Sequence, residues 1–556
     1  MILIKEELPV RVSGVTSLFI SAPYNEETIN IIKQCPVAIW DKKKQIWEVP
    51  LNSLHFLIDN LTFIDDIKLS IKEDENVYVS ECKPVLEYKT KPFQHQIEGI
   101  QFGLTHDKWL LLDGMGLGKS FQIINIAREL KQQRGLEHCL VICGLNTLKS
   151  NWKKEIGIHS DETVRVLGER ISKNGRITYT KIPERAKELE EPIKEFFIVT
   201  NIETFRSDLV VEAFKKSKNN IDMVVVDEVH KIKNKNSKQG DNLLKIDSKY
   251  KIAATGTLLL NNPLDAFVPL KWTDNEHSNL TNFKNLYCRY GGFGGHEVVG
   301  FKNLDLLKDE IESCSLRRTK DLLDLPPKTI IEEVLDMSDE QADFYEAIKK
   351  GVKEEADKVD LKTSNLLALV TRLRQATSCP SVLTSQNIDS VKVERCVDLV
   401  EELVSNNEKV VVFSTFKETV VKLQEALKHY KPLILTGDTK DAETSDIVDR
   451  FQTDSRSKVL IGTWQKAGTG ITLTAASYMI FLDTPWTDAI FSQACDRIYR
   501  IGTKKSVFIY NLICKNTIDE RVSFLLKQKK AISDFIIDDD MSESTLSALR
   551  NYIEEL

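Results

Sequence analysis

A membrane-spanning segment is missing from this sequence. No run in its 556 residues approaches the roughly 18 consecutive apolar residues that a membrane helix needs. The first residues, "MILIKEELPV", include acids and show no cleavable signal pattern. With 42% hydrophobic residues, the chain still has material for several cores. We therefore expect a protein without membrane association that folds into about three or four domains of roughly 150 residues each.

Paired cysteine motifs are also missing. The ten cysteines are scattered, and none belongs to a C-x-x-C pair. Cys139 and Cys143 lie in the apolar run "CLVIC", which predicts burial in a strand. Neither a zinc site nor a disulfide framework is indicated, so a reducing compartment is expected. That compartment is the cytoplasm of a bacterial or phage-infected cell, or the nucleus if the source is eukaryotic.

A general excess of basic residues is absent as well. The net charge is −7, which argues against a protein that is basic all over. Nucleic acid stays possible, because affinity depends on a local basic face and not on the total charge. One candidate for such a face is the stretch 231–251, "KIKNKNSKQGDNLLKIDSKYK", which has seven lysines and two aspartates.

The first 85 residues predict a small separate α+β domain. A strand in "SLFISAP" is followed by a helix in "NEETINIIKQCP", with Asn25 as its N-cap. A hairpin in "AIWDKKKQIWEVP" turns at the lysines, and a second helix in "LNSLHFLIDNL" is capped by Asn52. The spacer "SECKPVLEYKTKP" then leads to the main body.

The remainder predicts two α/β lobes. Residues 90–270 alternate helical stretches with the short apolar runs "WLLLD", "CLVICG", "FFIVTN", "MVVVDE" and "IAATG". Strands buried on both faces are typical of a parallel sheet covered by helices. A charged helical insert is expected at 271–385. The alternation returns over 386–530, in "KVVVFST", "PLILTG", "KVLIGTW", "YMIFLD" and "SVFIYNLI". The tail at 531–556 predicts a capped helix.

A glycine-rich loop, "LLDGMGLGKSFQ", joins a predicted strand to a predicted helix at residues 111–122. A strict G-x-x-x-x-G-K-[ST] phosphate loop has glycine where this chain has Asp113. Lys119 is expected to reach the β and γ phosphates of a nucleotide, and Ser120 to hold Mg²⁺. A plain glycine turn is the alternative, which G-x-G-K-S after a buried strand disfavours. The predicted nucleotide contacts in the loop are Gly116, Leu117, Gly118, Lys119 and Ser120.

An acidic pair ends the strand "MVVVDEVH". Asp227 is expected to bind Mg²⁺, mainly through its water shell, and Glu228 to polarise the attacking water. His230 is a candidate for coupling this lobe to its neighbour. A strand that ends in acids is common, but one that follows a phosphate loop by roughly a hundred residues predicts an ATPase core.

These motifs resemble those of superfamily-two helicases of the SWI/SNF type, whose loop typically reads D-E-M-G-L-G-K-T. Asp113 matches the aspartate of that family, and Gly114 replaces its usual glutamate. The resemblance covers residue 92 onward and implies that both parallel-sheet lobes are RecA-like. "PFQHQIEGI" resembles the adenine-reading segment, with Gln96 as the base-recognising residue. "LRRTKDLLDLPPK" and "TRLRQATSCP" resemble the region that links the lobes.

The resemblance also assigns residues of the second lobe. "SQACDRIYRIG" is similar to the arginine-finger segment, where Arg497 and Arg500 are expected on one helical face, oriented by Gln493. "KAGTGITLTAA" is similar to the segment that meets both DNA and nucleotide, and it adds Gly470 to the nucleotide contacts. The residues implied to contact DNA are Lys231, Lys233, Lys235, Thr415, Gly468 and Thr469.

The function implied by the resemblance is ATP-dependent translocation along double-stranded DNA, with ATP and Mg²⁺ as cofactors and the chain acting as a monomer. The N-terminal stretch resembles the HARP domain of annealing helicases, which implies action on forked or branched DNA. Trp40 and Trp47 flank the lysine tip of the hairpin; alternatively, both simply pack the hairpin against its helices.

Other functions stay open at this point. A strand-separating helicase or a remodeller of protein–DNA complexes could use the same motor. A DNA-binding scaffold with an inactive ATPase is disfavoured, because Lys119, Asp227, Glu228 and both arginines are intact.

Overall fold

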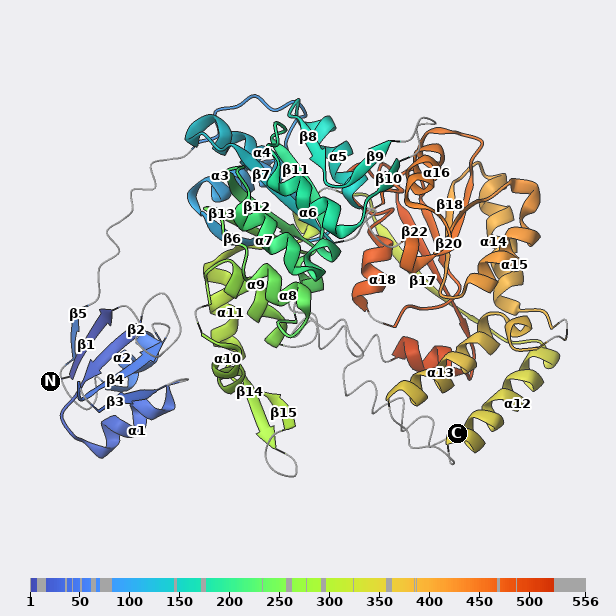
Figure 1. Cartoon of the computed structure of the whole chain (residues 1–556). Coiled ribbons are helices and arrows are strands. Elements are labelled where there is room, and N and C mark those ends of the chain that lie inside the picture. The colour runs from blue at the N-terminus through green and yellow to red at the C-terminus, as the bar shows by residue number, and fades with distance from the viewer. Residues whose placement is uncertain are drawn as a thin grey trace. The chain divides into compact units, whose positions relative to one another are not determined.

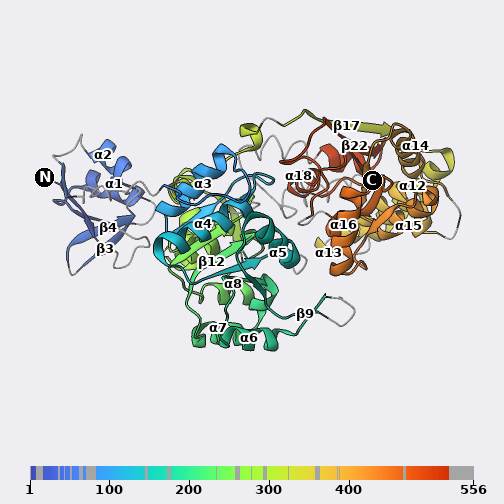
Figure 2. The ribbon, with the colours of Figure 1, turned by 90° about the horizontal axis from the view of Figure 1, so that it is seen from above.

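The structure is a computed structural model that divides into two compact units, the first mainly up to Thr319 and the second from Lys320 onward. Figures 1 and 2 show the ribbon of the chain from two directions. Among helices of the described residues, none combines the length and apolar character of a membrane span. The described residues are 2–7, 17–35, 38–42, 44–50, 53–61, 67–70, 83–144, 148–171, 177–232, 234–256, 263–276, 278–291, 297–323, 325–356, 363–384, 386, 388–467, 471–486 and 488–524.

The N-terminal domain is a five-stranded sheet with order β3-β4-β2-β1-β5 and two helices. The predicted strand, helix, hairpin and helix are confirmed, and Asn25 caps the first helix by accepting from the Glu27 N–H at 3.0 Å. Strands β1 and β5 were not predicted. The second cap, Asn52, lies outside the described residues. The elements are β1 (Ile2–Glu7), β2 (Ser17–Ser21), α1 (Glu26–Gln34), β3 (Ile39–Asp41), β4 (Ile46–Pro50), α2 (Leu54–Leu61) and β5 (Ile67–Ser70).

One face of this sheet forms the domain core. Ile4 pairs with Ile20 and Leu18 with Val49, so these buried side chains share a face. Trp47 lies on the same face and packs against this core, while its cross-strand neighbour Trp40 remains 40% exposed on the edge strand. The packing alternative is therefore confirmed for Trp47, whereas Trp40 contacts the Trp47 ring but stays partly exposed.

The first lobe contains a seven-stranded sheet with order β16-β6-β13-β12-β7-β11-β8. All of its strand pairs are parallel, which confirms the five predicted strands. Parallel strands bring their carboxyl ends to one edge, where α/β proteins bind their ligands. The bounds are β6 (Lys108–Leu111), β7 (His138–Cys143), β8 (Val164–Val166), β11 (Phe197–Asn201), β12 (Ile221–Asp227), β13 (Tyr250–Ala254) and β16 (Ser315–Leu316).

Helices cover both faces of this sheet, as Figure 2 shows. Trp109 and Val141 face α3, α4 and α5, whereas Leu110 and Ile142 face α6, α7 and α8. A small β9–β10 hairpin is separate from the sheet. The elements are α3 (Gln94–Thr105), α4 (Lys119–Arg134), α5 (Leu148–His159), β9 (Glu169–Ile171), β10 (Ile177–Tyr179), α6 (Ile182–Glu190), η2 (Ile202–Arg206), α7 (Asp208–Lys216), η3 (Val229–Ile232) and α8 (Lys238–Leu243).

The spacer after the N-terminal domain is bound to the first lobe from residue 83 onward. The buried carboxylate of Glu129, on α4, accepts from the N–H groups of Val85 at 3.0 Å and Leu86 at 2.9 Å. The Lys89 ammonium donates to the Gly157 carbonyl at 3.0 Å. The spacer is thus a strap on this lobe and not a free linker over these residues.

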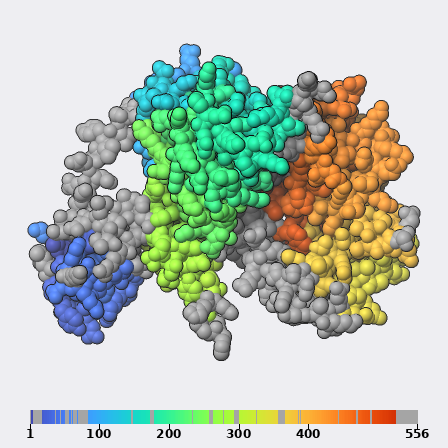
Figure 3. Space-filling model, viewed as in Figure 1, coloured from blue at the N-terminus to red at the C-terminus, as the bar shows by residue number. Residues whose placement is uncertain are grey.

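The insert contains the expected helices together with four strands that were not predicted. Strand β16 joins the first sheet and β17 joins the second, so the insert contributes to both lobes. The β14–β15 hairpin follows α10, and its yellow-green surface forms a projection from its unit (Figure 3). The first lobe ends with η4 (Pro263–Ala266) and α9 (Phe267–Trp272), and the insert contains α10 (Leu280–Tyr287), β14 (Cys288–Gly291), β15 (Glu297–Phe301), α11 (Leu304–Ser313), η5 (Lys320–Leu322), β17 (Lys328–Leu335), α12 (Asp339–Ala356), α13 (Thr363–Ser378) and η6 (Pro380–Val382).

The second lobe contains a six-stranded parallel sheet with order β17-β22-β21-β18-β20-β19, which confirms the five predicted strands. Helices α14 and α15 cover one face, and α16 and α18 the other. The expected tail helix lies outside the described residues. The bounds are α14 (Val391–Ser405), β18 (Val410–Ser414), α15 (Lys417–Ala426), η7 (Lys428–Tyr430), β19 (Leu433–Leu435), α16 (Asp441–Thr453), β20 (Val459–Thr463), α17 (Trp464–Ala467), β21 (Tyr478–Phe481), α18 (Asp488–Cys495) and β22 (Val507–Cys514).

Candidate nucleotide site and its partner motifs

The glycine-rich loop runs from the end of β6 to the start of α4. Gly116 and Gly118 have φ values of +84° and +78°, a left-handed conformation that favours glycine. A Cβ on Gly118 would also lie 2.2 Å from Nε2 of Gln96. The Gln96 side chain is buried, and its Oε1 accepts from the Phe93 N–H at 3.0 Å. The structure therefore holds Gln96 directly against the loop.

Lys119 is the first residue of α4, and its ammonium lies over the loop. Nζ donates to the Asp113 carbonyl at 2.8 Å and lies 3.4 Å from the Gly114 carbonyl. The N-cap residue, Gly118, supplies no capping side chain. The first N–H groups of a helix attract anions, so the loop and the start of α4 suit a phosphate group.

Asp113 explains why this loop departs from the strict pattern. Its fully buried carboxylate forms a bidentate ion pair with Arg318, with Nε–Oδ1 at 2.9 Å and Nη2–Oδ2 at 2.6 Å. Gln122 also donates to Asp113 Oδ2 at 2.9 Å, and the Arg318 carbonyl accepts from the Gly114 N–H at 2.8 Å. The aspartate thus anchors the loop to the segment that precedes the second unit.

Sequence reasoning did not assign Arg318. The only signal was its place in "LRRTKDLLDLPPK", a stretch similar to the linking region of the family. Its guanidinium side chain is only 10% exposed, so the pair with Asp113 is largely removed from water.

The acidic pair lies at the carboxyl end of β12. Asp227 Oδ2 accepts from the Trp152 indole N–H at 3.0 Å, and its Oδ1 accepts from the Glu228 N–H at 3.0 Å. Burial raises the pKa of Asp227 to about 6, the Glu228 charge adds to that rise, and Trp152 and the Lys119 charge oppose it. The structure therefore brings Lys119 of the loop within electrostatic range of the acids.

Glu228 has an unusual backbone conformation. Its φ of +55° is left-handed, which is rare and strained for a residue other than glycine. A Cβ on Gly144, at the end of β7, would lie 2.8 Å from the Glu228 Cβ, so the glycine makes room for the acid. Glu228 Oε2 lies 3.3 Å from His230 Nδ1, which is 2.9 Å from the buried Thr255 hydroxyl. The acids are thereby connected to the end of β13.

The carboxylates suit a hard divalent cation. Glu228 raises the pKa of its neighbour Asp227, a repulsion that a bound cation would relieve. Mg²⁺ prefers oxygen ligands and usually keeps several waters beside one or two protein groups and substrate phosphates. Within the described part of the chain, no cluster of three or more His, Cys, Asp or Glu side chains could hold a metal. A carboxylate with a hydroxyl, here Asp227 and Ser120, matches the sparser requirement of Mg²⁺.

The lysine-rich stretch after His230 is less basic in the fold than in the sequence. Lys238 pairs with Asp208 at 2.6 Å, and Lys245 with Asp241 at 2.6 Å. Lys251 is buried in β13 between the carboxylates of Asp247 and Asp274. The stretch as a whole is therefore not a continuous basic face.

The first part of the lysine-rich stretch, residues 231–235, contains the lysines that were predicted to contact DNA. The Lys231 side chain passes over Gly144, and the Lys235 ammonium lies 5.8 Å from the Phe267 ring centroid. Lys233 lies outside the described residues.

The two arginines of the second lobe do not share a helical face, so that prediction is wrong. Helix α18 ends at Cys495, and both residues lie in the turn that follows. The Arg497 carbonyl accepts from the Leu473 N–H at 2.8 Å, a tertiary bond that replaces a continued helix. Arg500 Nη1 donates to the Thr472 hydroxyl at 2.9 Å, and Arg497 Nη1 lies 3.4 Å from the Ile471 carbonyl.

Both arginines contact the same segment, residues 471–473. It follows Gly468, Thr469 and Gly470 directly, and those three residues lie outside the described part of the chain.

Thr415 lies at the carboxyl end of β18. Its N–H donates to Asp483 Oδ2 at 3.1 Å, and its hydroxyl oxygen accepts from the Trp464 indole N–H at 3.2 Å. Sequence reasoning missed both partners, because they come from different strands and no motif pointed to them.

A parallel sheet with a glycine-rich loop suited to phosphate, and with a further strand that ends in two acids, is typical of an ATPase lobe of the phosphate-loop class. Here a second parallel-sheet lobe follows. A model of the SNF2-related domain matches residues 95–382, and a model of the helicase conserved C-terminal domain matches residues 391–502. The chain belongs to the SNF2-related family of ATPases, which confirms the predicted family.

Several proteins are similar to this chain over most of its length. An "Uncharacterized ATP-dependent helicase" of Mycoplasma pneumoniae is 28% identical over 511 residues, which cover 89% of this chain and 47% of that protein. The "DNA annealing helicase and endonuclease ZRANB3" of Bos taurus is 27% identical over 467 residues, or 81% of this chain and 40% of that protein. The chain thus spans less than half the length of these relatives.

A solved structure is also similar. It is described as the Sulfolobus solfataricus SWI2/SNF2 ATPase core in complex with dsDNA, and it is 24% identical to this chain. The match covers 84% of this chain and 96% of that one, with a TM-score of 0.36.

Proposed function

We propose that this chain hydrolyses ATP to translocate along double-stranded DNA. The observation that carries the proposal is the first-lobe site, where the loop lysine lies within electrostatic range of an acidic pair with a strained catalytic-type glutamate. Strained backbone is concentrated at functional sites. The name of the Mycoplasma pneumoniae relative, an ATP-dependent helicase, agrees with this proposal.

The nucleotide-site residues of the first lobe divide the work of binding and hydrolysis among them. Gln96 recognises the adenine base, and Lys119 binds the β and γ phosphates. Glu228 orients and polarises the attacking water. Ser120 and Asp227 hold Mg²⁺, which when bound neutralises charge on the phosphates.

The second lobe completes the site when the lobes close. Arg497 and Arg500 supply positive charge to the γ-phosphate, which ties hydrolysis to a movement of the lobes. Both lobes bind the phosphates of the DNA. The first lobe does so through the lysines after His230, and the second through Thr415, Gly468 and Thr469. Such contacts do not depend on base sequence.

We further propose that the N-terminal domain directs this motor to forked or branched DNA. The Bos taurus relative is named a DNA annealing helicase, and Trp40, which is 40% exposed, lies on the strand that precedes Lys42. A strand-separating helicase and a remodeller of protein–DNA complexes are the competing functions for the same motor.

ATPase rates with single-stranded, plain duplex and forked DNA test the motor. Duplex DNA should stimulate hydrolysis, and Lys119→Ala should abolish it by removing nucleotide binding. A chain whose ATPase ignores duplex DNA would contradict the translocase assignment.

Deletion of residues 1–81 tests the role of the N-terminal domain. This cut spares Val85 and Leu86, whose N–H groups are bound to Glu129. The truncated protein should remain an ATPase that duplex DNA stimulates, and should lose its preference for forked substrates. Replacing Lys42, Lys43 and Lys44 by alanine should give the same loss if the hairpin tip makes the contact. Equal fork regression by truncated and full-length protein would refute the fork assignment and leave the translocase assignment standing.

A further inference from the structure

The carboxyl edge of the second sheet fixes Thr415 at two points. Asp483, just after β21, accepts from the Thr415 N–H at 3.1 Å and from the Ser414 hydroxyl. Trp464, just after β20, donates its indole N–H to the Thr415 hydroxyl oxygen at 3.2 Å. Three neighbouring strands thus place both the main chain and the side chain of this one threonine.

The hydrogen-bond chemistry of this arrangement has a direction. A threonine hydroxyl can donate one hydrogen bond and accept two, whereas an indole N–H can only donate. When Trp464 donates, it occupies a lone pair of the Thr415 oxygen and leaves the hydroxyl proton for an acceptor. A phosphate diester oxygen is an acceptor only, so it is a matching ligand.

The neighbouring helix favours the same kind of ligand. Helix α15 begins two residues after Thr415, and its N-cap, Phe416, has no side-chain oxygen to cap the first N–H groups. Helix N-termini attract phosphate groups.

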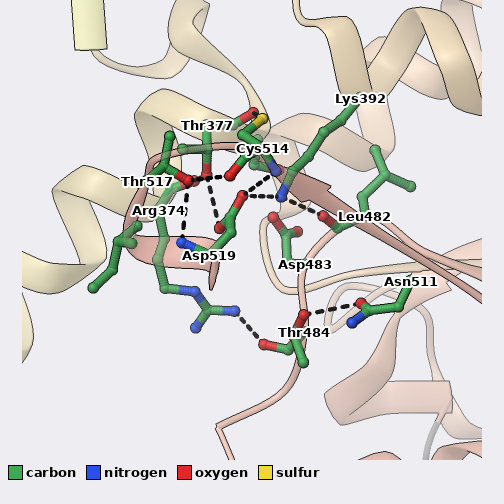
Figure 4. A network of polar contacts seen from close by, with 12 residues as sticks. Arg374, Thr377, Lys392, Leu482, Asp483, Thr484, Asn511, Cys514, Thr517 and Asp519 are labelled. Carbon is green, nitrogen blue, oxygen red and sulfur yellow. Dashed lines mark hydrogen bonds and ion pairs between the residues drawn. The ribbon is translucent and has the colours of Figure 1, made fainter. Parts of the chain in front are cut away.

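Asp483 is held from both sides by buried cations, as Figure 4 shows. Lys392 of α14 donates to the Leu482 carbonyl at 2.8 Å, and Arg374 of α13 donates to the Thr484 carbonyl. Asp483 is 2% exposed, and its Oδ1 has no hydrogen-bond partner among the described residues. The two cations therefore bind the carbonyl groups of the residues on either side of Asp483.

The charges in this cluster balance. Lys392 forms an ion pair with Asp519 at 2.6 Å, and both Arg374 and Lys392 lie within electrostatic range of Asp483 and Asp519. Two buried cations thus face two buried carboxylates, so neither sign of charge is in excess within the cluster. The cluster holds the main chain on both sides of Asp483, whose carboxylate accepts from the Thr415 N–H.

We propose that Trp464 and Asp483 are positioning residues that orient the Thr415 hydroxyl as a hydrogen-bond donor to a DNA phosphate. Trp464 sets the direction of the hydroxyl, and Asp483, held by Arg374 and Lys392, sets the position of its main chain. The inference rests on the proposed function, because it requires duplex DNA to bind this lobe.

A double-mutant cycle on the full chain tests the inference. The measured quantity is the duplex DNA concentration that half-saturates the ATPase. Thr415→Val should raise it about tenfold, and Trp464→Phe, which keeps a ring but loses the N–H, about threefold. Because Trp464 acts through Thr415, the double variant should be no worse than Thr415→Val alone. Thr415→Ser, which keeps the hydroxyl, should bind DNA like the wild type.

Matched variants separate this effect from a loss of folding. Trp272→Phe in the first lobe also removes a buried indole hydrogen bond, to the Ile246 carbonyl, and should leave half-saturation by DNA unchanged. Asp483→Asn should raise half-saturation in the wild-type background and not in the Thr415→Val background. If that variant does not fold, the Trp464 cycle alone still decides.

Three results would overturn the inference. Wild-type half-saturation in Thr415→Val removes the threonine from the DNA contacts, and additive effects in the cycle mean that Trp464 does not act through it. Duplex DNA that stimulates the wild type, together with either of these results, leaves the proposed function intact. No stimulation of the wild type would overturn both.

Discussion

At the carboxyl edge of the first sheet, Asp227 has a raised pKa and its neighbour Glu228 has a left-handed backbone conformation. At the same edge of the second sheet, Asp483 is surrounded by two cations and a second carboxylate whose charges cancel. The first edge leaves its charge to be balanced by a ligand. The second balances its charge internally and presents hydroxyl and N–H groups. The comparison shows one topology with two kinds of edge, and we propose that the first serves chemistry and the second places a DNA contact.

The largest expected effect concerns Arg500, a residue of the second lobe with a proposed role in hydrolysis. Arg500→Ala should bind ATP and DNA and hydrolyse ATP about 10³-fold more slowly, because the charge on the γ-phosphate would lose its partner. Steady-state and single-turnover ATPase assays measure this loss. Arg456→Ala, at a side chain that is 91% exposed in the same lobe, is the control. Wild-type turnover by Arg500→Ala would remove Arg500 from the residues proposed to act in hydrolysis.

The next effect is on the anchor of the phosphate loop. Arg318→Ala leaves the buried Asp113 carboxylate without its cation, which should cost about 3–5 kcal/mol of stability. Arg318→Lys should recover only part of it, because an ammonium cannot form the bidentate pair. Thermal unfolding and ATP affinity report the change, and the exposed neighbour Arg317→Ala serves as the control. An unchanged melting temperature would mean that the loop needs no anchor.

A smaller effect is the pH dependence of stability that Asp227 gives to the first edge. Asp227 has a folded pKa of about 6, above its ordinary value of 3.8. A raised carboxyl pKa contributes stability that is present below about pH 4 and is lost as the pH rises through 6. Without nucleotide and with a chelator, Asp227→Asn should therefore have a free energy of unfolding about 1–2 kcal/mol higher than that of the wild type at pH 8. At pH 4 the two should be equally stable. Denaturant unfolding at the two pH values measures this difference. Asp483→Asn should instead destabilise the fold at pH 8, since it removes one carboxylate from a cluster with two buried cations.

The smallest effect tests which lysines after the acids touch DNA. Replacing Lys231 and Lys235 should weaken all duplexes alike and flatten the salt dependence of binding by roughly 0.9 for each phosphate that is no longer neutralised. Lys238, which is paired with Asp208, is the matched control and should leave the slope unchanged. Equal slopes for both variants would place the first lysines away from DNA.

The two sheets were largely predictable, because short continuous apolar runs between helical stretches are typical of strands that are buried on both faces. The edge strand β17, "KTIIEEVL", was missed because its exposed side chains interrupt the apolar run with acids. The helical face for Arg497 and Arg500 was wrong because Leu473, distant in sequence, takes the Arg497 carbonyl. Local periodicity contains no trace of such a bond.

Within the candidate site, motif spacing predicted Lys119, Asp227 and Glu228, which lie near one another in the fold. It could not predict the partner of Asp113, because Arg318 is 205 residues away in the chain. The same holds for Trp464 and Asp483, which meet Thr415 only after three strands have paired.

The strap over α4 gives the first lobe a mechanical property. Glu129 holds Val85 and Leu86 on the helix whose first residue is Lys119. Tension that builds between the N-terminal domain and a resisting DNA structure would travel along the chain, enter α4 at Glu129 and strain the helix that holds the phosphates. We therefore expect the Glu129→Gln motor, whose grip on the strap is weakened, to slow less steeply under opposing force in a single-molecule assay. An unchanged force–velocity curve would mean that tension bypasses this helix.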